Sequence, residues 1–254
     1  MPISSSTLFH FTSDLDRVVG ILENDCRPHF SLENLNVLAP KEASRPELEF
    51  AVPMVSFCDI PLSQVEKHTR AYGKYGLGLT KEWGRRNKIA PVLYTYRGSR
   101  LASRLSALAI AINSLTGPTL QVRQLQDSFY DLSCYVKPYE GPLERRGKTT
   151  PRYRFYDERE WRYVPPPASD LYRYGMTKAE FGNSAGRAQG NAWLWNRSRL
   201  KFAPRDIKYI IVAKEDEIVP AIHHVERGKS RFGPDQVRLL ISRIVSAEQI
   251  LSDF

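Results

Sequence analysis

Short apolar segments with either alternating or helical spacing recur along the chain, and they predict a mixture of strands and helices. Residues 7–12 are apolar and aromatic with alternation, which is typical of a first strand. Residues 13–14 (Ser-Asp) can then cap a helix, and its apolar positions recur at helical spacing at Leu15, Val18, Val19 and Leu22. Residues 52–58 are a second predicted strand. The intervening segment, from about Pro28 to Glu49, has little periodicity and is expected to be a polar loop.

The same patterns continue through the rest of the chain. Further strands are predicted at 91–96, 156–164 and 207–212. Further helices are predicted at 62–72, 81–88 and 215–227. A stretch punctuated by glycines, 72–79, leads into a strand of its own. Residues 169–196 are rich in Gly, Ala and aromatic side chains and match no single pattern.

Two internal segments interrupt this order of short elements. Residues 99–136 have the longest helical periodicity, with one apolar stripe at Leu101, Leu105, Leu108, Ala109 and Ile112. Residues 137–154 are rich in Pro, Gly and Arg and are expected to be a basic loop. We therefore expect one α+β domain over residues 1–254, with short mixed or antiparallel strands and a helical insertion.

The charge composition of the chain indicates which classes of binding partner are favoured. The chain has 37 Lys and Arg against 28 Asp and Glu, a formal net charge of +9 and a pI near 9.5. A basic balance favours an anionic partner, such as nucleic acid, a dinucleotide or an acidic protein. A basic surface that serves only solubility explains the charge equally well.

Cysteine use and hydropathy indicate a cytoplasmic protein outside the membrane. The three cysteines are far apart and form no C-x-x-C motif, which argues against disulfides or structural zinc: Cys26, Cys58 and Cys134. The most apolar stretch, 101–120, is too short to span a bilayer and contains Arg104 and Asn113. The adjacent pair His223–His224 lacks the spacing of metal ligands on a helix, so no metal site is expected.

Two carboxylates stand close together in the predicted strand 156–164. Side chains alternate along a strand, so Glu158, Glu160 and Arg162 are expected on one face. Two acids on one face repel each other, which favours a site that uses a carboxylate. Glu158 and Glu160 are therefore both candidates for such a site.

His10 is the second candidate. It is expected on the strand face opposite Phe9 and Phe11, together with Thr12, and a helix begins directly afterwards. A neutral imidazole, a hydroxyl and free backbone N–H groups suit ribose hydroxyls and phosphate. The alternative is a hydrogen-bonded structural histidine, which is common on strands.

Tyr72 and Tyr75 flank the glycines of residues 72–79. Glycines let a backbone approach a ligand closely, and a tyrosine ring can pack on a base. A tight turn with packed tyrosines explains the same residues. The G-x-G-x-x-G and G-x-x-x-x-G-K-[ST] motifs are absent, and Ser56 and Cys58 lie in no nucleophile signature.

A cluster of basic residues in the predicted basic loop could hold phosphates or RNA: Arg145, Arg146, Lys148, Arg152 and Arg154. A solvated loop is the alternative. No sequence signature of an RNA-recognition or helix-turn-helix module accompanies this cluster.

Taken in order, these segments resemble the AbiGi family of phage abortive-infection proteins, usually described as antitoxin partners of nucleotidyltransferase-like toxins. The resemblance covers most of residues 7–165, with a weaker continuation over 200–212. It rests on residues 8–12, 52–63, 72–79 and 158–162, and on His68, Lys81, Trp83, Pro91, Val92 and Tyr94. It implies a role in phage defence and a cognate toxin or antitoxin protein as partner.

The chain is also more distantly similar to ADP-ribosyltransferases, above all to DNA-modifying toxins with a histidine-threonine pair on the first strand. This similarity implies an ADP-ribosyltransferase-like fold with a split core, and NAD as substrate. It implies that His10 and Thr12 hold a ribose, that Tyr72 or Tyr75 packs on nicotinamide, and that Glu160 is catalytic. The middle Ser-Thr-Ser strand and the catalytic arginine of those toxins have no clear match.

Two hypotheses follow from the sequence. In the first, the protein uses NAD to ADP-ribosylate a nucleic acid or protein acceptor. In the second, it is a non-catalytic antitoxin or interaction module that binds a toxin or RNA. The enzyme requires Glu160 in an open cleft near His10, with Tyr72 or Tyr75 beside it. The module requires Glu160 to be paired with Arg159, Arg162 or another arginine and closed off from solvent.

Overall fold

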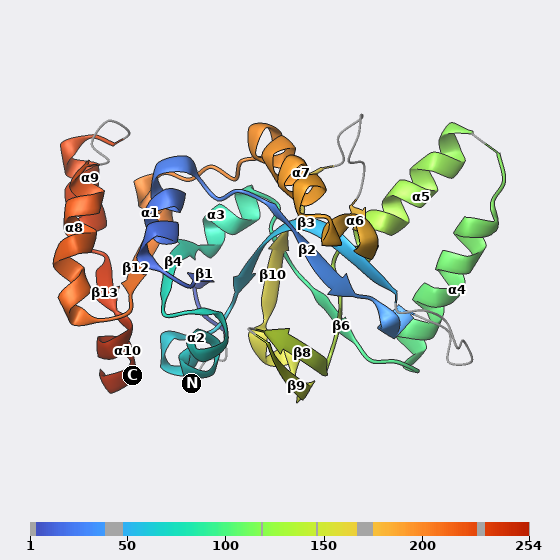
Figure 1. Cartoon of the computed structure of the whole chain (residues 1–254), viewed down its shortest axis with the longest axis horizontal. Helices are drawn as coiled ribbons and strands as arrows, with labels where there is room; N and C mark the ends of the chain where they lie inside the picture. The colour runs from blue at the N-terminus through green and yellow to red at the C-terminus, as the bar shows by residue number, and fades with distance from the viewer. Residues whose placement is uncertain are drawn as a thin grey trace.

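The computed structural model describes residues 4–38, 48–117, 119–145, 147–166, 175–227 and 232–253. Within them the protein is a mixed α+β structure centred on a nine-stranded sheet (Figure 1). The main path runs β13 (Ile244–Ser246), β12 (Ile207–Val212), β4 (Tyr75–Thr80), β1 (Thr7–Thr12), β3 (Glu49–Cys58), β10 (Glu160–Tyr163) and β5 (Ala90–Pro91). Two more strands pair with β3, namely β2 (His29–Asn34) and β11 (Met176–Thr177).

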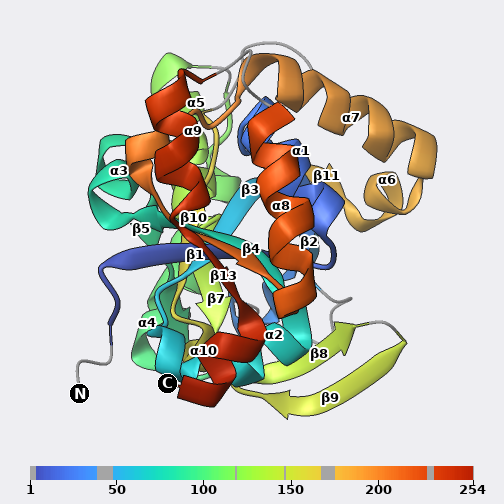
Figure 2. The same cartoon turned by 90° about the vertical axis from the view of Figure 1, so that its left-hand side faces the viewer.

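Helices cover both faces of this sheet. One core cluster joins the central strands to α1 (Leu15–Asn24), α3 (Lys81–Arg86), α8 (Ile218–Arg227) and α9 (Pro234–Ile241). Figure 2 shows α8 and α9 on the same side of the molecule, with α10 (Ala247–Asp253) below them. A second cluster packs α10 and the turn before α2 (Glu66–Tyr72) against the other sheet face. The predicted strand at 7–12 and the helix capped by Asp14 are confirmed, since Asp14 accepts the N–H of Arg17.

The sheet splits between its two central strands. β1 pairs with β4 along six positions, but it pairs with β3 only where Phe9 faces Cys58. β3 turns instead to β10 and β2, and β11 pairs at its start. A split therefore opens between β1 and β3, and it exposes backbone groups that a continuous ladder would have paired.

Three sequence-based expectations about secondary structure were wrong. The segment 28–49 is only partly a loop, because β2 and a short helix at Asn36–Leu38 occupy it, and 39–47 lies outside the described residues. The basic loop contains strand β7 (Val136–Pro138) and a hairpin of β8 (Gly141–Arg145) and β9 (Lys148–Tyr153). The predicted strand 91–96 divides between β5 and β6 (Leu93–Thr95), and β6 pairs with β7.

The expected helical insertion is a pair of helices, α4 (Arg100–Ser114) and α5 (Leu120–Ser133), that lies at one end of the molecule (Figure 1). Ser99 and Thr119 cap the two helices by accepting backbone N–H groups. α4 buries Ala102, Leu105 and Ile112, whereas much of the remaining apolar surface of the pair faces solvent. The insertion therefore presents an apolar surface to solvent.

The region 169–196 contains two more helices, α6 (Lys178–Gly182) and α7 (Ser184–Arg197). Gly190 lies where α7 crosses β2, and a Cβ there would meet Met176 Cε at 2.3 Å. The glycine therefore permits close packing of α7 on the sheet. Residues 167–174 lie outside the described residues.

Candidate functional site

A pocket of about 950 Å³ opens at the split between β1 and β3. α1, α2, β2 and the end of α7 complete its walls. Its polar lining contains acidic, basic and neutral side chains: His10, Thr12, Arg17, Arg27, His29, Glu33, Ser56, His68, Tyr72, Lys137, Glu158 and Glu160. The fold therefore brings most of the sequence-predicted residues into one cavity.

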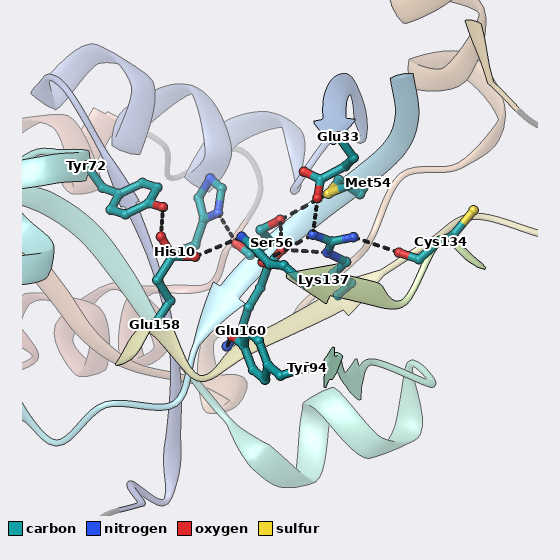
Figure 3. A network of polar contacts seen from close by, with 11 residues as sticks. His10, Glu33, Met54, Ser56, Tyr72, Tyr94, Cys134, Lys137, Glu158 and Glu160 are labelled. Atoms are coloured by element: carbon teal, nitrogen blue, oxygen red, sulfur yellow. Dashed lines mark hydrogen bonds and ion pairs between the residues drawn. The ribbon is translucent and has the colours of Figure 1, made fainter. Parts of the chain in front are cut away.

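Glu160 lies at the floor of this pocket, where both of its carboxylate oxygens are bound (Figure 3). Arg162 Nε donates to Oε1 at 2.6 Å, and Ser56 Oγ donates to the same oxygen at 2.8 Å. Lys137 Nζ donates to Oε2. The Glu160 side chain is 6% exposed. The carboxylate thus lines the cavity, but it is already saturated with donors.

The buried network fixes the ionisation of its members. Burial alone would raise the pKa of the Glu160 carboxyl, but the charges of Arg162 and Lys137 outweigh it and hold that pKa below its ordinary value. Burial would lower the pKa of Lys137, but Glu160 and Glu158 raise it above the ordinary value. Arg162 is fully buried and also donates to Glu33 Oε2 at 2.6 Å. All three groups are therefore charged at neutral pH.

Glu158 reaches the same network from outside the strand. Residues Phe155–Glu158 form a 3-10 turn, and Arg159 adopts a left-handed conformation with φ of 45° before β10 begins. The expected strand face shared by Glu158 and Glu160 was therefore wrong, although Glu160 and Arg162 do share one. Lys137 Nζ nevertheless joins the two acids, since it also donates to Glu158 Oε2 at 2.8 Å.

His10 faces the gap that the split leaves beside β3. Its Nδ1 lies 2.8 Å from the carbonyl oxygen of Ser56, which can only accept, so Nδ1 carries the proton and Nε2 is an acceptor. Burial lowers the pKa of His10 despite this bond, so the ring is neutral at pH 7. β1 and β10 do not pair directly. Ser56 links the two strands, binding His10 through its carbonyl group and Glu160 through its hydroxyl group.

The remaining predicted ligand residues differ in position. Thr12 lines the pocket, but its hydroxyl donates to the carbonyl of Asp14 at 3.1 Å. Tyr72 lines the pocket, stacks on His68 with centroids 4.2 Å apart and donates to Glu158 Oε1. Tyr75 lies elsewhere and donates to Glu217, a bond that raises the pKa of Tyr75 to about 12.

The glycines beside these tyrosines serve strand packing. Gly73 has φ of 119°, and a Cβ there would lie 1.9 Å from the carbonyl oxygen of Thr12. At Gly76 a Cβ would meet the carbonyl oxygen of His10 at 2.7 Å. Both glycines therefore let the segment pack closely against β1, whereas the sequence had suggested that they let it approach a ligand.

Sequence reasoning missed two members of the network, Lys137 and Glu33. Lys137 lies in β7, inside the segment expected to be a basic loop, and Glu33 lies in β2, inside the expected polar loop. Arg162 was placed on the correct face, and the module hypothesis named it among the possible partners of Glu160, which the structure confirms. In the described part of the chain, no group of three or more His, Cys, Asp and Glu side chains could hold a metal ion. None of the described helices is long and apolar enough to cross a membrane.

Comparison with known proteins shows which protein family the chain resembles. The family model described as abortive phage resistance protein AbiGi, antitoxin, matches residues 40–213, which is more than half of the chain. The chain belongs to the AbiGi family. The abortive phage resistance protein AbiGi of Lactococcus lactis subsp. cremoris is 29% identical over 248 residues, covering 89% of this chain and 98% of that protein. No solved structure matches this AbiGi protein.

Proposed function

We propose that this AbiGi protein is a non-catalytic antitoxin that binds a partner toxin in phage defence. The saturated Glu160 carboxylate carries this proposal. Its oxygens are held by Ser56, Lys137 and Arg162 in a nearly closed network, so a substrate hydroxyl would first have to displace a charged donor. Such displacement is costly for a buried pair. The family description as antitoxin agrees with this reading.

The region best suited to a protein partner is the helix pair α4 and α5, because apolar side chains are exposed on several sides of it. We call these exposed residues the hairpin face: Leu101, Leu108, Ile110, Leu115, Leu120, Leu125 and Leu132. Ile110 is 55% exposed and Leu120 is 71% exposed. Exposed apolar side chains that gather on one element favour protein contacts. Arg104 and Arg123 are exposed on the same helices, so an acidic partner surface is favoured.

A pair of substitutions tests this reading. Ile110→Asp with Leu125→Asp places two charges on the hairpin face without touching the core. Val219→Asp is the matched control, because Val219 is 57% exposed on α8, at the opposite end of the molecule (Figure 1). The readouts are the affinity of the purified protein for its cognate toxin and the survival of cells that express both proteins.

We expect the double variant to bind the toxin at least about 30-fold more weakly, since interface hot spots are worth about 2 kcal/mol or more. Cells with this variant should lose protection, whereas Val219→Asp should behave as wild type. Unchanged binding and protection in the double variant would reject the hairpin face as the toxin site. If wild type binds no toxin at all, the antitoxin proposal itself fails.

A second candidate function, ADP-ribosyl transfer from NAD to a nucleic acid or protein, is favoured by one specific arrangement. The neighbouring strands β1, β3 and β10 bring His10, Ser56 and Glu160 to a single pocket. Ser56 lies on β3, the middle strand of these three. The sequence alone gave no clear match to the middle Ser-Thr-Ser strand of the DNA-modifying toxins. An ADP-ribosyltransferase-like fold with a split core is consistent with this arrangement.

The chemistry would use Glu160 as a fixed anion. Cleavage of the nicotinamide–ribose bond builds positive charge on the ribose, and a carboxylate that binds the 2′-hydroxyl stabilises this charge. In this reading Glu158 would accept the proton of the incoming nucleophile. His10 Nε2 is left as an acceptor for a ribose hydroxyl, and Tyr72 offers its ring to nicotinamide.

The two candidate functions predict different results for Glu160→Gln, a substitution that keeps the shape of the side chain and removes its charge. The enzyme predicts NAD consumption and a modified acceptor with wild type, and loss of both with Glu160→Gln. The antitoxin predicts no NAD turnover with either protein and unchanged toxin binding wherever folding is intact. NAD consumption that survives Glu160→Gln would reject the assigned role of Glu160.

A further inference from the structure

A cluster of tyrosines lies on the surface at the base of the β8–β9 hairpin. Tyr139 precedes β8, and Tyr156 follows β9 in the 3-10 turn. Their rings stack with centroids 5.3 Å apart and an interplanar angle of 28°. Tyr139 is 36% exposed and Tyr156 is 46% exposed. Two large, stacked rings thus remain open to solvent, although aromatic pairs more often bury such area.

Tyr96 is a third exposed tyrosine, and its backbone neighbours that of Tyr139. The parallel register of β6 and β7 pairs Thr95 with Pro138, and Tyr96 and Tyr139 directly follow these two residues. The N–H of Tyr139 donates to the carbonyl of Thr95 at 2.7 Å, which fixes this alignment. Tyr96 is 64% exposed. We call Tyr96, Tyr139 and Tyr156 the tyrosine platform.

The hairpin that rises from this platform is basic. Residues 141–154 contain five basic residues and one acidic residue. Lys148 and Arg152 both lie on β9 and both are exposed, and a register shift between them interrupts the regular strand alternation. Figure 2 shows the hairpin extending away from the body of the protein. Three exposed acids lie close in sequence, Glu140, Glu144 and Asp157, and Asp157 approaches Arg154 at 3.8 Å.

From these observations we propose that the tyrosine platform and the β8–β9 hairpin form a binding site for single-stranded nucleic acid. Exposed aromatic rings next to a basic groove or strand are the combination that holds single strands, because bases stack on the rings while cations follow the phosphates. A duplex hides the faces of its bases, so it could use only the basic hairpin. The apolar hairpin face lacks this combination, and the inference is independent of toxin binding.

The platform is connected to the floor of the pocket through one ring. Tyr94 packs edge-on against Tyr156 with centroids 5.2 Å apart, and its hydroxyl accepts the backbone N–H of Glu160 at 2.9 Å. Burial raises the pKa of Tyr94, so this hydroxyl remains neutral. A nucleic acid strand on the platform would therefore lie one side chain away from β10.

The test uses the full-length protein and fluorescence anisotropy with labelled 20-nucleotide poly-U RNA, poly-dT DNA and a duplex of equal length. Tyr139→Ala and Tyr156→Ala remove the rings, whereas Tyr139→Phe and Tyr156→Phe keep them. Arg152→Gln removes one cation of the hairpin, and Arg238→Gln on α9 is its control, because Arg238 has 80% of its side chain exposed. Thermal melts establish that each variant is folded.

We expect both single strands to bind more tightly than the duplex, with the RNA and DNA arms showing whether the sugar matters. Each alanine variant should bind at least about fivefold more weakly, and each phenylalanine variant should match wild type. Arg152→Gln should reduce the slope of log affinity against log salt by about 0.7, and Arg238→Gln should not.

Three results would overturn the proposal. One is the absence of single-strand binding at low salt, and another is equal affinity for duplex and single strands. The third is loss of toxin binding in the alanine variants without any nucleic acid binding, which would assign the platform to a protein interface. If an alanine variant is unfolded, the phenylalanine and Arg152 variants still decide the question, because loss of affinity on Phe substitution contradicts stacking.

Discussion

Removal of the Arg162 guanidinium should destabilise the protein more than any surface change. Arg162 is fully buried, and it donates to Glu160, to Glu33 and to the carbonyl of Cys134 at 2.6–2.7 Å. Arg162→Met keeps an unbranched side chain but leaves the buried Glu160 carboxylate and the partly buried Glu33 carboxylate without this cation. Breaking a buried ion pair by removing one partner costs about 3–5 kcal/mol. Domains of this kind unfold with only about 5–15 kcal/mol, so a large share of the stability would be lost.

Urea denaturation, followed by tryptophan fluorescence and circular dichroism, measures this loss. Arg238→Met is the control, because its pair with Asp235 is exposed and should contribute at most about 0.5 kcal/mol. Adding Glu160→Gln to Arg162→Met removes one of the carboxylates that lost this cation, so the double variant should be more stable than the sum of the single effects by about 1 kcal/mol or more. A cost below about 1 kcal/mol for Arg162→Met, or strict additivity, would refute the reasoning.

Three further predictions follow from the site and its surroundings. The pKa of Glu160 is lower in the folded than in the unfolded state, so its stabilisation is present above pH about 4.5 and lost as the pH falls; urea midpoints in acid should fall less steeply for Glu160→Gln. Gly73→Ala should cost more than about 1 kcal/mol in urea, because of its φ and its contact with β1, whereas Gly20→Ala, with open space around its Cβ, should be neutral or slightly stabilising. A thiol reagent should react slowly with the native protein and with three thiols after unfolding, because all three are buried: Cys26, Cys58 and Cys134.

Strongly patterned segments were predictable from the sequence. The strand at Thr7–Thr12 and the helix after Asp14 have clear periodicity and a capping side chain, and the structure contains both. The placement of Glu160 and Arg162 on one face follows from strand alternation alone. These cases share a local cause, because the signal lies within a few consecutive residues.

The partners of Glu160 depended on distant pairing, which no local pattern encodes. Lys137 sits among prolines and glycines that favour a loop, yet β7 forms because it pairs with β6. Glu33 lies in β2, whose pattern is masked by polar residues on its half-buried positions. Glu158 leaves the strand because Arg159 turns left-handed, and Lys137 brings it back to Glu160. Tertiary contacts thus overrode weak local preferences.

The buried charge network joins residues that are synthesised at very different times. Glu33 and Ser56 leave the ribosome first, Lys137 follows about 80 residues later, and Arg162 comes last. Until then, the early acid has no cation to neutralise it, and β3 lacks the neighbour that β10 provides. A chain interrupted before residue 162 would hold unpaired charges and an open sheet edge, features that expose intermediates to aggregation and proteolysis. The network can therefore be completed only after nearly two-thirds of the chain has been synthesised.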